Sequence, residues 1–226
     1  MSSLTAMATF NVPDRVCFGP DGRGGDFNYG QVRALTPQLQ IEALRRRHGA
    51  WLVDQSKPLA ANGASPFPLA VMACVGMEAL GQIAFGAGPN PKDLSYPFVQ
   101  VAREMDPLFA ATLTPAFRAA FDSRWTGALD LKAKTTSVGD AASLLYMFFR
   151  NSMIHGYRGR AVFLTADETP SVKLEEPEGT MALNPSWLWK RYEDVVTSNF
   201  DDIVNASLTP NPKRANAVQR LALMLK

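Results

Sequence analysis

Hydrophobic residues recur at helical spacing over much of the chain. Over residues 32–57, the apolar pattern is formed by Leu35, Leu39, Leu44, Trp51 and Leu52. Pro37 stands near the start of this stretch and Pro58 beyond its end, so we predict a helix over 32–57. A more continuous apolar stretch predicts a buried helix over 69–85, which Gly86 and Gly88 close.

Shorter helical patterns follow this buried stretch. Two helices are predicted over 98–109 and 115–125, divided at Thr114-Pro115. Next, Ser137 and Asp140 have the spacing of a capping box, and an apolar helical pattern then runs from 141 to His155. Gly156 is a suitable end for that helix.

Three short β-prone segments interrupt the helical pattern near the end of the chain. They cover 161–164, 171–174 and 180–183, and their turn-forming linkers favour a hairpin or a small meander. Asn184-Pro185 is a good cap and first-turn pair for a helix over 185–206, and a last helix is expected from Pro212 to Lys226. The fold class predicted is mainly α, with a small β insertion.

The composition agrees with one packed core. With 46% apolar and 19% charged residues, the 226-residue chain is too hydrophobic for a disordered protein. Residues 1–30 include the glycine-rich segment 19–25 and are expected to be a flexible leader. We place the main helical domain at 31–208 and a C-terminal helical tail at 209–226.

Charge and cysteine content exclude several classes of protein. A net charge of +2 is too small for a dedicated duplex-binding protein. Cys17 and Cys74 offer neither a disulfide framework nor a zinc site, and a cytoplasmic protein without an export signal is expected. The apolar segment 67–85 is interrupted by Pro68, Glu78 and Gln82, so we expect no membrane span.

The clearest candidate for chemistry lies at the end of the helix predicted up to His155. Arg150, Asn151 and His155 are polar groups at the end of an otherwise apolar helix. Asn151 and His155 are four residues apart and share a helical face, and the long side chain of Arg150 can converge with them. A buried arginine needs a carboxylate or an anion as its partner. We expect either Glu78 or a cleft that accepts an anion to supply it.

An arginine followed directly by asparagine, with four residues between the arginine and a later histidine, resembles the motif of the HEPN superfamily. Arg150, Asn151 and His155 match that motif, and Tyr157, two residues past the histidine, resembles a subset of HEPN toxins paired with a minimal nucleotidyltransferase antitoxin. The resemblance implies a helical bundle that forms a homodimer with the two motifs facing each other. It also implies a metal-independent endoribonuclease that needs no cofactor, such as a toxin or a phage-defence or stress-response effector.

The motif residues suit RNA cleavage without a metal. Such cleavage needs a base, an acid and a cation that stabilises the charge of the phosphorane. His155, near a helix C-terminus, is a suitable base, and the second chain of a dimer would supply another His155 as the acid. Arg150 is the cation and Asn151 orients the histidine or the phosphate. Tyr157 binds phosphate or, by resemblance, accepts a nucleotide that silences the enzyme.

A structural interpretation of the same residues stays open. Arg150 can pair with Glu78 while Asn151 and His155 satisfy backbone groups at the helix end. The function would then be that of a non-catalytic interaction module with the HEPN fold. The basic segment 45–48 is interpreted as a solvated helix end, and Trp187 and Trp189 as core residues.

Overall fold

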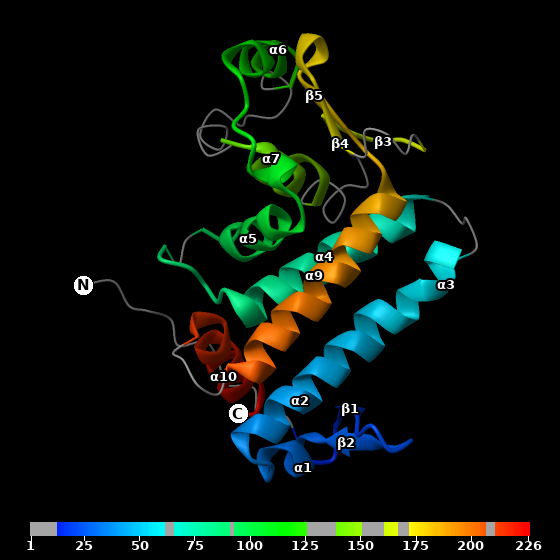
Figure 1. Ribbon diagram of the computed structural model, residues 1–226, viewed down its shortest axis with the longest axis vertical. Coiled ribbons are helices and arrows are strands. Elements are labelled where there is room, and N and C mark those ends of the chain that lie inside the picture. Colours follow the sequence, from blue (N-terminus) through cyan, green and yellow to red (C-terminus); the bar gives the residue numbers. More distant parts are fainter. Residues whose placement is uncertain are drawn as a thin grey trace.

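Long helical rods that cross the molecule diagonally organise this fold (Figure 1). The computed structural model describes residues 13–61, 66–90, 93–125, 139–150, 161–166, 172–206 and 211–226. Its central rods are a run of α2 (Pro37–His48), η1 (Gly49–Asp54) and α3 (Gln55–Ala61), together with α4 (Pro66–Ala84) and α9 (Pro185–Asn205). Helices dominate the described residues, which confirms the mainly α fold class.

The first rod covers 37–61 and so begins and ends later in the chain than the predicted helix over 32–57. It starts at Pro37, because Thr36 caps α2 by accepting a hydrogen bond from the Leu39 amide. A separate helix, α1 (Tyr29–Arg33), precedes it. Pro58 lies within α3 rather than beyond the end of the rod. Pro58 is the fourth residue of α3, and the π-helical segment η1 directly precedes that helix.

Helix α4 forms the centre of the core. It packs against α5, α9 and α10, and residues such as Ala73, Met77 and Leu80 are fully buried. Its segment Phe67–Ala84 is long and apolar enough to cross a membrane, but 56% of that window is buried inside the protein. Gly86 and Gly88 follow the helix with left-handed backbone angles, as predicted for its C-terminal end.

The middle of the chain forms shorter helices along one side of α4. These are α5 (Tyr96–Met105), the 3-10 turn η2 (Pro107–Ala110), α6 (Pro115–Trp125), α7 (Ala141–Leu145) and the π-helix η5 (Tyr146–Arg150). The prediction that α5 continues to Phe109 is wrong, because Pro107 cannot extend it and Asp106 has an extended backbone. The predicted range of α6 is confirmed.

The β-prone segments form a three-stranded sheet next to α6. Its strands are β3 (Val162–Leu164), β4 (Val172–Glu175) and β5 (Thr180–Leu183), in the order β3-β5-β4. Strands β4 and β5 are antiparallel and are joined by η6 (Glu176–Glu178), which confirms a hairpin. Strand β3 pairs with β5 in parallel, so the sheet is not a simple meander.

The glycine-rich segment belongs to a packed hairpin, which differs from the expected flexible leader. Strands β1 (Cys17–Pro20) and β2 (Asp26–Asn28) pair antiparallel, and α2 contacts β1. Phe18 is fully buried, and its ring lies edge-on to Tyr29 at 5.2 Å between centroids. The glycines therefore form the turn of a hairpin that covers one end of the bundle (Figure 1).

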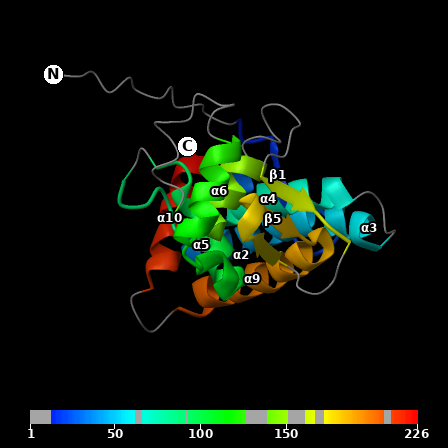
Figure 2. The same cartoon turned by 90° about the horizontal axis from the view of Figure 1, so that it is seen from above.

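The C-terminal part of the chain completes the bundle. Helix α9 starts where predicted, with Asn184 accepting a hydrogen bond from the Trp187 amide at 2.9 Å. It passes over α4 in Figure 1, and the view from above shows it along one edge of the molecule (Figure 2). Helix α10 (Pro212–Met224) packs against α2, α4 and α9, and its Ala217 and Leu221 are buried.

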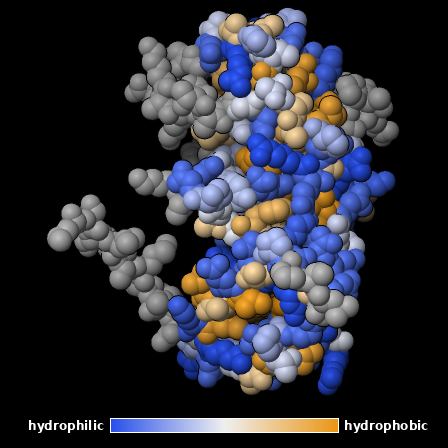
Figure 3. All heavy atoms as spheres, turned by 60° about the vertical axis from the view of Figure 1, so that its left-hand side comes forward, coloured by the Kyte–Doolittle hydropathy of each residue, from blue (hydrophilic) through white to orange (hydrophobic). Residues whose placement is uncertain are grey.

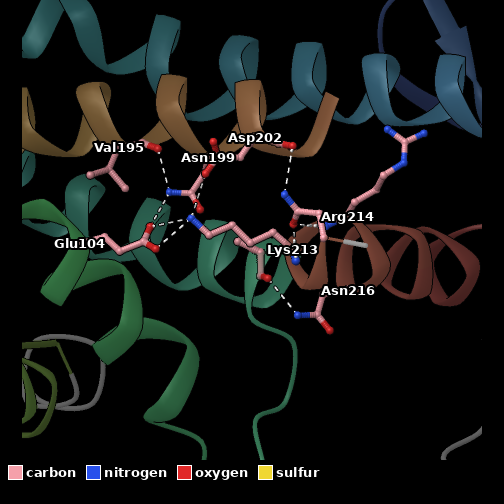
Figure 4. A network of polar contacts seen from close by, with 9 residues as sticks. Glu104, Val195, Asn199, Asp202, Lys213, Arg214 and Asn216 are labelled. Carbon is pink, nitrogen blue, oxygen red and sulfur yellow. Dashed lines mark hydrogen bonds and ion pairs between the residues drawn. The ribbon is translucent and has the colours of Figure 1, made fainter. Parts of the chain in front are cut away.

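Polar contacts hold α10 to its neighbours (Figure 4). The Lys213 ammonium lies 2.8 Å from a carboxylate oxygen of Glu104 on α5 and 3.3 Å from Asp202 on α9. Asn199 of α9 donates to the same Glu104 side chain at 2.8 Å. Asn216 donates to the Ala84 carbonyl at the end of α4 at 2.9 Å. The tail is thus fixed to three other helices.

Candidate functional site

The helix that carries Arg150 starts at Asp140. The Asp140 side chain accepts hydrogen bonds from the amide of Ser143 at 2.8 Å and from its hydroxyl at 2.7 Å. Asp140 has extended backbone angles and is itself the N-cap, so the predicted capping box, with Asp140 at its third helical position, is wrong. The guanidinium of Arg103, on α5, donates to the other carboxylate oxygen of Asp140 at 2.9 Å. This ion pair fixes the start of α7 against α5.

Apolar packing then leads this helix to Arg150. Leu144 and Leu145 are fully buried, and Phe148 and Phe149 are each 2% exposed. The Phe148 ring meets the Phe121 ring of α6 edge-on, with 4.8 Å between centroids. A helix buried on so many sides has little freedom to rotate, so the position of Arg150 at its end is fixed by the core.

Arg150 forms an ion pair with Glu78 of α4. Its Nη2 donates to Oε2 of Glu78, and the two side chains are 15% and 24% exposed, respectively. The guanidinium also lies 5.4 Å from the centroid of the Tyr146 ring one turn earlier. The expectation that Glu78 is the partner of Arg150 is therefore confirmed. The arginine is held at the boundary between the core and the surface.

Cys74 lies one helical turn before Glu78 on α4 and does not have the properties of a nucleophile. It is buried, and burial raises the pKa of its thiol to about 12, although the nearby Arg150 charge opposes that shift. A thiol with such a pKa is protonated at neutral pH. The chemistry near Arg150 would have to come from other groups.

The other three predicted site residues, Asn151, His155 and Tyr157, lie outside the described residues. The structure therefore places one member of the motif, Arg150, together with its carboxylate partner. The segment just before Asn151 is the π-helix Tyr146–Arg150, whose hydrogen bonds span five residues rather than four. The prediction that Arg150 and Asn151 converge assumed regular α-helical spacing, which the π-helix before Asn151 does not have. Such π-helical turns are frequent at functional sites.

Metal binding finds no support in the part of the chain that the structure describes. No three His, Cys, Asp or Glu side chains come together there in a group that could hold an ion.

The basic segment 45–48 is placed differently from the prediction of a solvated helix end. His48 is only 4% exposed, and its Nε2 lies 2.7 Å from the Tyr192 hydroxyl of α9. Burial lowers the pKa of His48 to about 4. Its spacing from the buried Ile41 and Leu44, seven and four residues earlier, could have placed it on the buried face of α2.

The arginines of this segment also have defined partners. The Arg47 guanidinium stacks on the Trp51 ring at 3.8 Å, and Arg45 forms an ion pair with Asp201 at 2.8 Å. The core interpretation of the two C-terminal tryptophans is confirmed, since Trp189 is 3% exposed and Trp187 packs against the core.

Comparisons with known proteins do not assign this chain to a family. No protein-family model matches the chain, and no curated protein or solved structure was found to be similar to it.

Proposed function

We propose that this protein is a metal-independent endoribonuclease of the HEPN kind, acting in the cytoplasm as a homodimer. The observation that supports this function is the position of Arg150. Its guanidinium lies at the end of an apolar helix, where Glu78 and the buried helix hold it in place. A fixed cation is what stabilisation of a phosphorane requires, because no reorganisation is then needed when charge develops.

The proposed reaction divides the remaining roles among the motif residues. His155 removes the proton of the ribose 2′-OH, and the 2′ oxygen attacks the phosphorus to form a cyclic phosphate. The partner subunit's His155 protonates the 5′ oxygen that leaves. Arg150 stabilises the negative charge on the phosphorane, and Asn151 orients the histidine or the phosphate. In this proposal a nucleotidyltransferase antitoxin is the natural partner, with Tyr157 binding phosphate or accepting the silencing nucleotide.

Cleavage of single-stranded RNA in excess EDTA tests this function. The wild-type protein is expected to cleave, and Arg150→Ala and His155→Ala are each expected to lower the rate about 100-fold, since each removes a group acting in the transition state. Circular dichroism and thermal unfolding of both variants show whether they keep the fold. Equal rates for the three proteins, or no cleavage by the wild type, would eliminate the endoribonuclease.

A second function, that of a non-catalytic interaction module with the same fold, is favoured by the ion pair itself. Glu78 supplies the carboxylate that a partly buried arginine needs, so Arg150 can have a purely structural role. Under this alternative the dimer or a bound partner is the function, and the EDTA experiment shows no cleavage dependent on Arg150.

A further inference from the structure

A cavity of about 320 Å³ has neither Arg150 nor Glu78 in its lining. Its walls come from the end of α2 and the π-helix η1, from α4, and from α10. Glu78 of α4 pairs with Arg150, whereas the neighbouring Ala79 lines this cavity. The cavity is therefore separate from the proposed ribonuclease site, and its volume is near the lower limit for small-molecule sites.

The lining is apolar apart from a few basic groups. Leu44, Leu52, Ile83 and Met224 provide aliphatic walls, and Trp51, which is 42% exposed, provides an aromatic one. An apolar cavity with few, convergent polar groups is the usual form of a small-molecule site. Such walls suit a ligand whose larger part is a hydrocarbon chain.

Two arginines line this apolar space without a carboxylate beside them. Arg47 and Arg220 both line the cavity, and no Asp or Glu does. Neither arginine forms an ion pair with any residue in the ranges that the structure describes. Burial lowers the pKa of Arg47, whose charge is instead balanced by aromatic rings and the Phe18 carbonyl. Two such cations are the complement of an anionic head group.

The cavity walls are built to keep their shape. Arg47 is held by its stacking on Trp51 and by its hydrogen bond to Phe18, and His48 is anchored by Tyr192. On the opposite wall, α10 is fixed by the polar network around Lys213 (Figure 4). A preformed site loses less conformational freedom when it binds a ligand.

We propose that this cavity binds a small amphipathic carboxylate, with its chain among the aliphatic walls and its head between Arg47 and Arg220. A carboxylate is planar and accepts paired hydrogen bonds from a guanidinium, and it is smaller than a phosphate, the other anion that arginine binds in this way. The limited volume favours a medium-chain acid over a long-chain lipid. Figure 3 shows hydrophobic residues gathered in the lower half of the face that it draws, among hydrophilic ones.

Calorimetric titration of the full chain with decanoate, below its micellar concentration, tests this site. Saturable one-to-one binding is expected, together with a change in fluorescence that Trp51→Phe removes. Decanol and decyltrimethylammonium share the chain but lack the anion, so both are expected to bind at least about tenfold more weakly. Absence of decanoate binding, or equal binding of decanol, would overturn the proposal. Tighter binding of decyl phosphate than of decanoate would overturn the choice of a carboxylate.

Two variants locate the binding site. Arg220→Ala removes a cation that no described carboxylate balances, and it should weaken decanoate binding about tenfold. Ala79→Leu fills the cavity and is expected to abolish binding while the melting temperature stays at or above that of the wild type. Decanoate binding that survives both substitutions would show that the ligand binds elsewhere. These outcomes do not depend on RNA cleavage.

Discussion

Replacing Gly81 by alanine is expected to lower the free energy of unfolding by about 3 kcal/mol, because the new methyl group has no room. A Cβ at this position of α4 would lie 2.3 Å from the carbonyl oxygen of Pro97 and 2.5 Å from its carbonyl carbon. Both atoms belong to the backbone of α5, so no side-chain rotation relieves the overlap. The two helices would have to separate, and α4 is the centre of the core.

Gly49 provides the matched control for this substitution. It also lies in a helical segment with right-handed backbone angles, but a Cβ there meets no atom within 4 Å. Gly49→Ala should therefore leave stability unchanged or raise it by up to about 1 kcal/mol. Urea unfolding of both variants measures the difference. If Gly81→Ala proved as stable as Gly49→Ala, the close contact between α4 and α5 would be wrong.

Acidification from pH 6.5 to pH 4 is expected to remove about 3 kcal/mol of stability through His48 alone. In the folded protein, burial lowers the pKa of His48 from 6.5 to about 4. Between these values the unfolded chain binds a proton that the folded chain does not, so stability falls as the pH falls. The stability that the neutral imidazole contributes is fully present above pH 6.5.

His48→Gln separates this contribution from that of the carboxylates. Glutamine keeps a hydrogen-bonding group for the Tyr192 hydroxyl but does not titrate. The variant should lose stability less steeply than the wild type between pH 6.5 and pH 4, as measured by urea unfolding at several pH values. Parallel pH profiles for the two proteins would show that His48 is not buried in its neutral form.

Local sequence signals predicted much of the helical fold. The cap at Asn184, the two ends of α6 and the glycines after α4 are short-range features, and the structure has them as predicted. The pairing of Arg150 with Glu78 was also predicted, since a partly buried guanidinium between apolar helices needs a nearby carboxylate.

Features that depend on tertiary contacts were not predicted. The β1–β2 hairpin is stabilised by burial of Phe18 against distant residues, whereas its own sequence favours turns. The π-helix η1 lies just before Pro58 in the first rod, and no periodicity in the sequence signals it. Segment 45–48 contains a helix-end charge pattern, yet the Tyr192 hydroxyl, 144 residues away, makes burial of His48 favourable.

If Arg150 acts on a substrate rather than only on Glu78, two variants that break its ion pair differ in RNA cleavage. Arg150→Gln and Glu78→Gln both break the same ion pair, so each serves as the stability control for the other. In the EDTA assay, Arg150→Gln should lower the rate of RNA cleavage about 100-fold. Glu78→Gln should lower it about tenfold or less, because the guanidinium remains and the glutamine oxygen can still accept its hydrogen bond. An equal loss of cleavage in both variants, in proportion to their loss of stability, would show that Arg150 is only a structural partner of Glu78.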